Sequence, residues 1–174
     1  MWLGFDELEG ERNSIFLILG KALRLCQNYE MNFDSIMQII QLEEGIKRGA
    51  IIRFRDEQWD ATITKVSKWM LGTNVKELEK LGSISDRTIR KLTDGKEARN
   101  EIVHEGALML RRSIRTGFLD ENEGGYFRKA IESVAIADNV VAGWMWEVNE
   151  KERSFMSDGK YVERITNWIF SQNE

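Results

Sequence analysis

The sequence predicts an all-α protein, a single-domain bundle of four to five main helices. Three observations predict this class. Apolar residues recur at spacings of three and four along most of the chain, which is the periodicity of amphipathic helices. No segment shows a convincing strand-like alternation. Proline is absent, although an average usage of about 5% would give roughly nine prolines, so long helices are not interrupted.

The first predicted helix is long and begins near Ile15. Its apolar positions form one stripe, and Gly45 and Gly49 are typical of the region just past a helix end. Cys26 lies beside this stripe, so we expect it to be a small buried residue rather than a catalytic thiol. The stripe consists of Ile15, Ile18, Ala22, Leu25, Tyr29, Phe33, Ile36 and Ile40.

Shorter elements are expected next. A helical pattern covers residues 56–71, and Gly72-Thr73-Asn74 is expected to stop it. A short amphipathic piece follows through residues 78–81. Ser83 or Ser85 can then cap a further helix.

The pattern in the second half of the sequence predicts three more helical stretches. Asp94 and Glu97 have the spacing of a capping box, so we expect a helix to start or restart there and to run to Gly117. Residues 122–125 (Asn-Glu-Gly-Gly) are the plainest loop signal in the chain. Two helices follow, one with the stripe Phe127, Ala130, Val134, Ala137, Val141, Trp144 and Val148, the other with Tyr161, Ile165 and Trp168.

The composition favours a single globular domain without a membrane span. A chain of 174 residues with 42% apolar and 31% charged residues is suited to one globular domain, covering residues 1–174. No apolar run approaches the 18 or so residues of a membrane span, so we expect no membrane partner. The single Cys26 and the acidic start of the chain favour a reducing cytoplasm.

The charge is distributed unevenly. A net charge of −4 argues against coating nucleic acid by bulk electrostatics. The segment 86–115, however, carries 8 basic and 5 acidic side chains and surrounds the only histidine, His104. A basic patch beside the histidine is one interpretation, and a solvated helix face is the other.

Most catalytic and metal chemistries need residues that this chain lacks. One histidine and one cysteine cannot form a zinc site of the usual composition. Gly124-Gly125 is not followed by the Lys-Ser/Thr of a phosphate loop. A metal site built from carboxylates alone stays open, but the sequence indicates no metal and no cofactor.

The remaining candidate is the cluster Arg99-Asn100-Glu101-Ile102-Val103-His104. On a helix Asn100 lies one turn before His104, so its amide can orient the imidazole. Arg99 lies about 140° around the axis from His104, and its long side chain must reach across to share a site with the ring. A purely structural histidine is the competing interpretation.

Arg99-Asn100, followed by three residues and His104, on a late helix of a proline-free bundle, resembles the hallmark motif of the HEPN superfamily. That hallmark is an arginine, usually a polar residue, and a histidine a few residues later; here four residues separate Arg99 from His104. Ala98, Ile102 and Val103 are also typical, as are the segments 19–22 and 26–30 of the first helix.

The resemblance implies metal-independent cleavage of RNA by a homodimer, in toxin or antiviral-defence systems, with a cognate antitoxin or defence-system protein as a further partner. It implies His104 as general acid and base, Arg99 as phosphate and transition-state clamp, and Asn100 as the group orienting His104 or the substrate hydroxyl. A dimer supplies two imidazoles, whose unperturbed pKa near 6.5 suits both proton transfers. We expect Arg111, Arg112 and Arg115 to contact the RNA backbone.

The sequence departs from some relatives in one respect, and a rival function stays open. Relatives in toxin–antitoxin pairs carry a tyrosine two residues after the histidine, where this chain has Gly106. The rival is a catalytically inactive HEPN-like module that binds a protein or a nucleotide. Trp146 is the best candidate for a dimer or partner contact, and the N-terminal Trp2, Leu3 and Phe5 are further candidates.

Overall fold

The fold is all-α, as the sequence predicts. The computed structural model describes residues 11–148 and 158–171, and within these ranges it contains helices and no strand. None of the described helices is both long enough and apolar enough to cross a membrane. The helices are α1 (Glu11–Lys47), α2 (Glu57–Val66), α3 (Leu71–Lys80), α4 (Asp86–Met109), α5 (Arg111–Thr116), α6 (Glu121–Val148) and α7 (Asp158–Phe170).

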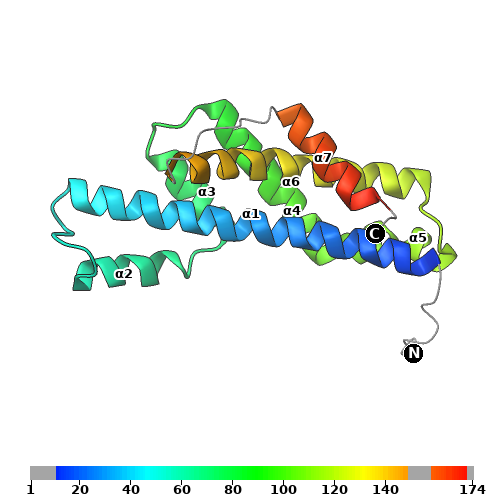
Figure 1. Cartoon of the computed structure of the whole chain (residues 1–174), viewed down its shortest axis with the longest axis horizontal. Helices are drawn as coiled ribbons and strands as arrows, with labels where there is room; N and C mark the ends of the chain where they lie inside the picture. The colour runs from blue at the N-terminus through cyan, green and yellow to red at the C-terminus, as the bar shows by residue number, and fades with distance from the viewer. Residues whose placement is uncertain (1–10, 149–157, 172–174) are drawn as a thin grey trace.

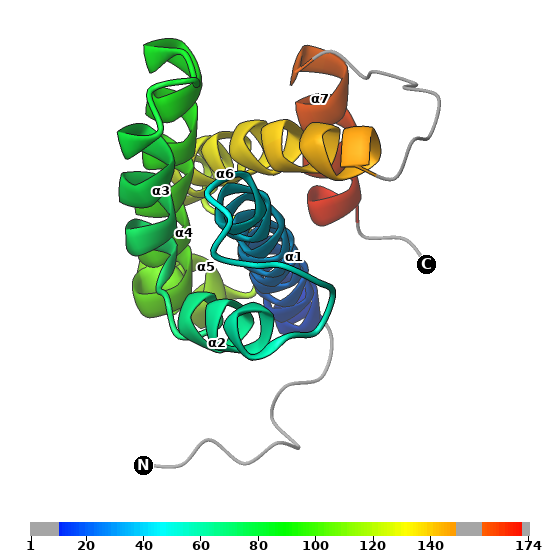
Figure 2. The same cartoon turned by 90° about the vertical axis from the view of Figure 1, so that its left-hand side faces the viewer.

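The long first helix forms the axis of the bundle. Its 37 residues make α1 about 55 Å long, and it spans most of the molecule (Figure 1). An end-on view shows α2, α3, α4 and α6 arranged around it (Figure 2). The predicted stripe is buried from Ile15 to Ile36, while Ile40 is partly buried. This prediction is confirmed, including the buried position of Cys26.

Helices α4 and α6 share the most extensive helix–helix contact. Their backbones lie close together at Gly95, where a Cβ atom would lie only 2.2 Å from the Cβ of Ala137 and 3.2 Å from the carbonyl oxygen of Ser133. Only glycine fits at this crossing. The contact therefore fixes α4, which carries the histidine motif, against the core.

The predicted stop at Gly72-Thr73-Asn74 is wrong. Helix α2 ends at Val66, and these three residues instead lie in the first turn of α3. Asn74 is fully buried, and its amide donates a hydrogen bond of 2.5 Å to the Asp34 carboxylate on α1. A polar residue that is typical of turns is thus kept inside a helix because a carboxylate of α1 satisfies its amide donor.

The predicted helix start at Asp94 is also wrong. The cap is Ser85, whose hydroxyl accepts from the Thr88 amide at 3.2 Å, and α4 runs from there without a break. Burial explains the continuity, because Leu92, Gly95, Ala98 and Ile102 all face the core at helical spacing. Arg99 therefore lies near the middle of a long helix rather than close to a helix start at Asp94.

The Asn-Glu-Gly-Gly segment at 122–125 is helical, so the predicted loop is wrong too. The Asp120 carboxylate caps α6 by accepting from the Asn122 and Glu123 amides at 3.1 and 3.2 Å. The Glu123 carboxylate reaches back to α5 and accepts from the Ser113 amide at 2.8 Å and the Ser113 hydroxyl at 2.7 Å. Gly124 packs against the Leu119 side chain. Capping and packing thus override the weak helix propensity of the two glycines.

Two predicted stripe residues are exposed, Val148 at the end of α6 and Trp168 on α7, and Val103 on α4 is exposed as well. The helix expected to run to Gly117 is interrupted at Leu110, where the backbone leaves helical geometry between α4 and α5.

Candidate functional site

The three motif residues occupy two different surroundings on α4. Asn100 and His104 are exposed and lie one helical turn apart, so their side chains share one outer face of the helix. Arg99 is directed toward α1, and only 18% of its side chain is exposed. The structure therefore places the histidine and the amide together and sets the guanidinium at the edge of the core.

Arg99 is held by an acidic residue that the sequence analysis did not single out. Its Nη2 atom donates to the Glu30 carboxylate on α1 and forms an ion pair with it. Its Nη1 atom donates to the side-chain oxygen of Asn100 at 3.1 Å. Its Nε atom is buried and has no hydrogen-bond acceptor among the described residues. The Arg99 guanidinium thus contacts both the Glu30 carboxylate on α1 and the exposed amide of Asn100.

The sequence holds only a weak signal for Glu30. Glu30 follows Tyr29, which belongs to the apolar stripe of the first helix. In the sequence it therefore looks like an ordinary charged residue on the solvent-exposed side of that helix. Only the packing of α4 against α1 brings it to Arg99, 69 residues further along the chain.

Cys26 lies one turn before Glu30 on α1. Burial, more than any other factor, raises the pKa of its thiol to about 12, and the Arg99 charge only partly opposes this effect. A thiol with so high a pKa is protonated at neutral pH and is a poor nucleophile. The expectation of a buried structural cysteine is therefore confirmed.

The polar contacts continue one turn further along α1. Burial raises the pKa of Asp34, the hydrogen bond from Asn74 on α3 opposes this rise, and the nearby Glu30 charge adds to it. The Asn74 side-chain oxygen is buried without a hydrogen-bond partner in the described part of the chain. Glu30 and Asp34 thus form a half-buried acidic edge that faces both α3 and α4.

The surroundings of His104 combine apolar and acidic side chains. Val103 and Leu108 are exposed beside it, and Glu101 and Glu105 flank it on α4. The Tyr126 hydroxyl on α6 donates to Glu101 at 3.3 Å, which ties one of these carboxylates to the neighbouring helix. The histidine therefore lies on an open face with apolar neighbours rather than in a cleft.

The three arginines predicted to contact RNA lie on α5, just beyond the motif helix. Arg111 and Arg115 are exposed. Arg112 is exposed as well, but its guanidinium pairs with Asp120 at 3.4 Å and its backbone amide donates to Glu123 at 2.8 Å. Arg112 is thus partly committed to the α5–α6 junction, whereas the other two leave their charges at the surface.

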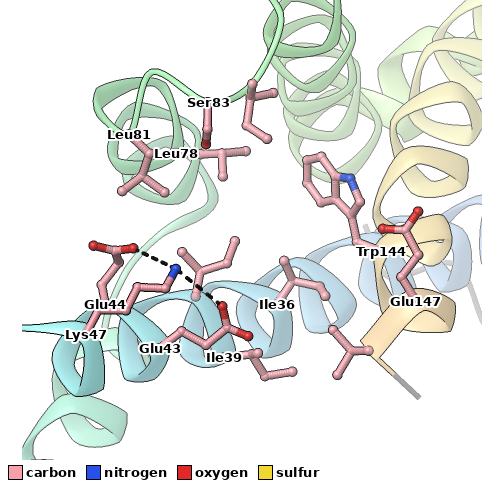
Figure 3. Close-up of a pocket in the computed structure, with 13 residues that line it drawn as sticks. Ile36, Ile39, Glu43, Glu44, Lys47, Leu78, Leu81, Ser83, Trp144 and Glu147 are labelled. Atoms are coloured by element: carbon pink, nitrogen blue, oxygen red, sulfur yellow. Dashed lines mark hydrogen bonds and ion pairs between the residues drawn. The ribbon is translucent and has the colours of Figure 1, made fainter. Parts of the chain in front are cut away.

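One cavity lies away from the motif. It has a volume of about 460 Å³ and is enclosed by α1, α3 and the end of α6 (Figure 3). Ile36, Leu78 and Trp144 line it from three different helices, and the ion pairs of Lys47 with Glu43 and Glu44 lie on its α1 side (Figure 3). None of Arg99, Asn100 and His104 lines it.

Other candidates from the sequence are placed as follows. Trp146 on α6 is exposed, so it remains a candidate contact residue. Trp2, Leu3 and Phe5 lie outside the described residues. Within the described ranges, no group of three or more histidine, cysteine, aspartate or glutamate side chains gathers in a way that could hold a metal ion.

The described helices define the class of this protein as an all-α helical bundle with an exposed histidine on its fourth helix. No family model matches the chain, and comparisons with curated proteins and with solved structures find no match either.

Proposed function

We propose that this protein is a metal-independent endoribonuclease of the HEPN type, active as a homodimer in a toxin or antiviral-defence system. The observation that carries the proposal is the arrangement of three side chains on α4. His104 and Asn100 share one exposed face, and Arg99 is hydrogen-bonded to Asn100 at 3.1 Å. An acid–base group and an amide therefore share one exposed face, and the cation at the edge of the core is hydrogen-bonded to that amide.

The chemistry gives each residue a role. The 2′-oxygen of a ribose attacks the adjacent phosphorus while one His104 accepts the hydroxyl proton. The bond from phosphorus to the 5′-oxygen breaks, and the second His104 returns a proton to that oxygen. The products are a 2′,3′-cyclic phosphate and a 5′-hydroxyl end. Arg99 stabilises the charge on the phosphate, and Asn100 orients His104 or the attacking hydroxyl.

The requirement for two histidines explains why the proposal includes a dimer. Each chain has one histidine, and it lies on an open face with exposed Val103 and Leu108 beside it. Apolar side chains on such a face suit the centre of a subunit interface. A symmetric contact through this face of α4 brings two copies of His104 together.

Glu30 acts in this proposal as a positioning residue. Its carboxylate restrains the Arg99 guanidinium in one orientation, so less conformational freedom is lost when a phosphate binds. Arg111 and Arg115 are exposed on the adjoining α5 and would contact the RNA backbone in this proposal.

The rival function is a catalytically inactive HEPN-like module that binds a protein or a nucleotide. One observation favours it: the Arg99–Glu30 pair already neutralises the charge that the nuclease needs. In that case Arg99 serves mainly to hold α4 against α1, and the exposed face of α4 binds a partner.

The test is RNA cleavage by the purified protein in the presence of EDTA, followed by analysis of the product ends. The nuclease proposal predicts cyclic-phosphate ends and a loss of at least about 100-fold in rate for His104→Ala, since general acid–base catalysis contributes that much or more. Asn100→Ala should also cleave more slowly, because Asn100 orients His104 or the attacking hydroxyl in this proposal. Its matched control is Asn28→Ala, which changes an exposed amide on α1 and should cleave at the wild-type rate. Equal rates for wild type and His104→Ala, or none from either, would overturn the nuclease proposal and favour the binding module.

A further inference from the structure

The connection between α1 and α2 differs from the rest of the surface. We call residues 46–55 the apical segment. It contains Lys47, Arg48, Arg53 and Arg55 and no acidic residue, in a chain whose net charge is −4. It also exposes three apolar side chains, at 52% for Ile46, 87% for Ile52 and 68% for Phe54. Cations and exposed apolar side chains thus coincide at one place.

The apical segment has a defined conformation. The Asp56 carboxylate accepts from the Ile52 amide at 2.9 Å and from the Arg53 amide at 3.2 Å, and it also caps α2. Phe54 packs edge-on against Trp59 with 4.8 Å between ring centroids. Arg55 has a positive φ of 59°, which is unusual for a residue with a side chain. The exposed side chains are therefore held outward by a built turn.

The cations of this segment are available for a partner. Lys47 pairs with Glu43 and Glu44, which lie one turn below on α1. In the part of the chain that the structure describes, no carboxylate forms an ion pair with Arg48, Arg53 or Arg55. The Arg55 guanidinium lies over the Phe54 ring, 5.1 Å from its centroid, so charge and apolar surface are adjacent.

The apical segment is bordered by five acidic residues, Glu43, Glu44, Asp56, Glu57 and Asp60, but it lies far from the acidic residues at the other end of the bundle (Figure 1). It lies at one end of the long axis (Figure 1), and the view from that end looks onto it (Figure 2). The rest of the chain carries a formal net charge of −8. Because α1 is about 55 Å long and the screening length is about 8 Å at physiological salt, most of that charge has little effect at the tip.

We propose that the apical segment binds the surface of an anionic lipid bilayer. Ile52 and Phe54 enter the boundary between headgroups and acyl chains, and Arg48, Arg53 and Arg55 pair with lipid phosphates and carboxylates. This proposal replaces the expectation that the protein has no membrane partner. It is independent of the nuclease proposal, because the apical segment connects α1 to α2 whereas His104 lies on α4.

The side-chain types favour a bilayer over an RNA strand. RNA contacts combine cations with aromatic rings on which bases stack. Here the most exposed side chain is the aliphatic Ile52, and one face of the Phe54 ring already lies against Arg55. An exposed aliphatic side chain at the end of the bundle (Figure 1) suits an apolar phase that lies behind anionic headgroups.

The test is flotation of the full chain with vesicles of phosphatidylcholine alone or with about one third phosphatidylserine, at low and high salt. Wild type should float only with the anionic vesicles, and less at high salt. Ile52→Ser with Phe54→Ser should reduce the partition coefficient at least about tenfold. Arg53→Gln with Arg55→Asn should reduce it about 25-fold, at about fivefold per arginine. Asparagine is chosen at position 55 because it tolerates a positive φ.

Matched controls separate the tip from general surface effects. Met70→Ser with Phe118→Ser removes two other exposed apolar side chains, and Arg24→Gln with Lys129→Gln removes two exposed cations. Both controls should float within twofold of wild type, with unchanged circular dichroism for every variant. Wild type that does not float, or tip variants that float like the controls, overturns the proposal. Tip variants that lose affinity for a labelled single-stranded RNA but keep vesicle binding overturn it in favour of an RNA contact.

Discussion

Arg99 on α4 and Glu30 on α1 form an ion pair at the edge of the core, with 18% and 33% of their side chains exposed. The pair joins the helix that carries the histidine motif to the helix that forms the axis of the bundle. It also fixes the orientation of the one motif residue that does not face the solvent. The same contact therefore bears on stability and on the proposed phosphate clamp.

Replacing Glu30 with glutamine should destabilise the fold. The Arg99 charge would stay mostly shielded from water without a counter-charge, which we expect to cost about 1–3 kcal/mol. Urea denaturation followed by circular dichroism measures the change. Glu77→Gln removes one carboxylate from the more exposed Lys80 pair and should cost less than about 1 kcal/mol. Equal losses for the two variants would contradict a special role for the Arg99–Glu30 pair.

Gly95→Ala should destabilise the protein although alanine is the better helix former. The new methyl group would collide with the Cβ of Ala137 at 2.2 Å, and separating α4 from α6 should cost at least about 2 kcal/mol. The double variant Gly95→Ala with Ala137→Gly should recover part of the loss. Gly20→Ala, where nothing lies within 4 Å, should instead stabilise by about 0.5–1 kcal/mol. Thermal unfolding of the three variants checks the order.

Asp138→Asn should stabilise the protein at neutral pH. Asp138 is only 4% exposed on α6; its Oδ2 atom accepts from the Tyr161 hydroxyl, and its Oδ1 atom has no partner among the described residues. Burial raises the pKa of this carboxyl, and the polar side chains of Tyr161 and Asn32 only partly oppose that rise. Removing the buried charge should add about 1 kcal/mol to the free energy of unfolding, since the amide oxygen still accepts from Tyr161.

The same residue gives a pH dependence with a definite sign. A carboxyl whose pKa is higher in the folded than in the unfolded state binds its proton more tightly in the folded state. Its contribution therefore favours folding below the unfolded pKa of about 3.9 and is lost as pH rises through the folded pKa. The gain from Asp138→Asn should thus shrink as the pH is lowered through this window. A gain that is constant with pH would show that the charge of Asp138 is not its cause.

Leu108→Glu should produce a monomer without RNA-cleaving activity if the proposed dimer is correct. Leu108 is 67% exposed and lies four residues after His104 on α4, so the two share a face. A carboxylate at the centre of a symmetric contact is repelled by its copy. His104→Ala should remain dimeric, as should Met70→Glu on α3's N-terminal side. Sedimentation velocity measures the state, and a dimeric Leu108→Glu would place the interface elsewhere.

The helices could largely be predicted from the sequence because their periodicity reflects burial on one face. The stripe from Ile15 to Ile36 and that from Phe127 to Val141 are buried as expected. The errors fall at boundaries, where local signals compete with packing. Gly72 and Gly124 look like helix stops, yet a neighbouring helix or cap makes each of these segments helical. The contacts that override these local signals form only when the chain folds, so the residue pattern alone does not reveal them.

What the sequence by itself determined is the all-α class, the long first helix and the neighbours of His104 along one helix, because each depends on residues within a few turns of one another. Only the tertiary structure decided which side chains contact Arg99. Its partner Glu30 lies on a helix that looks apolar in sequence, and the contact exists only because α4 packs against α1. The same packing leaves Asn100 and His104 exposed, since a helix buries one face and presents the other to solvent.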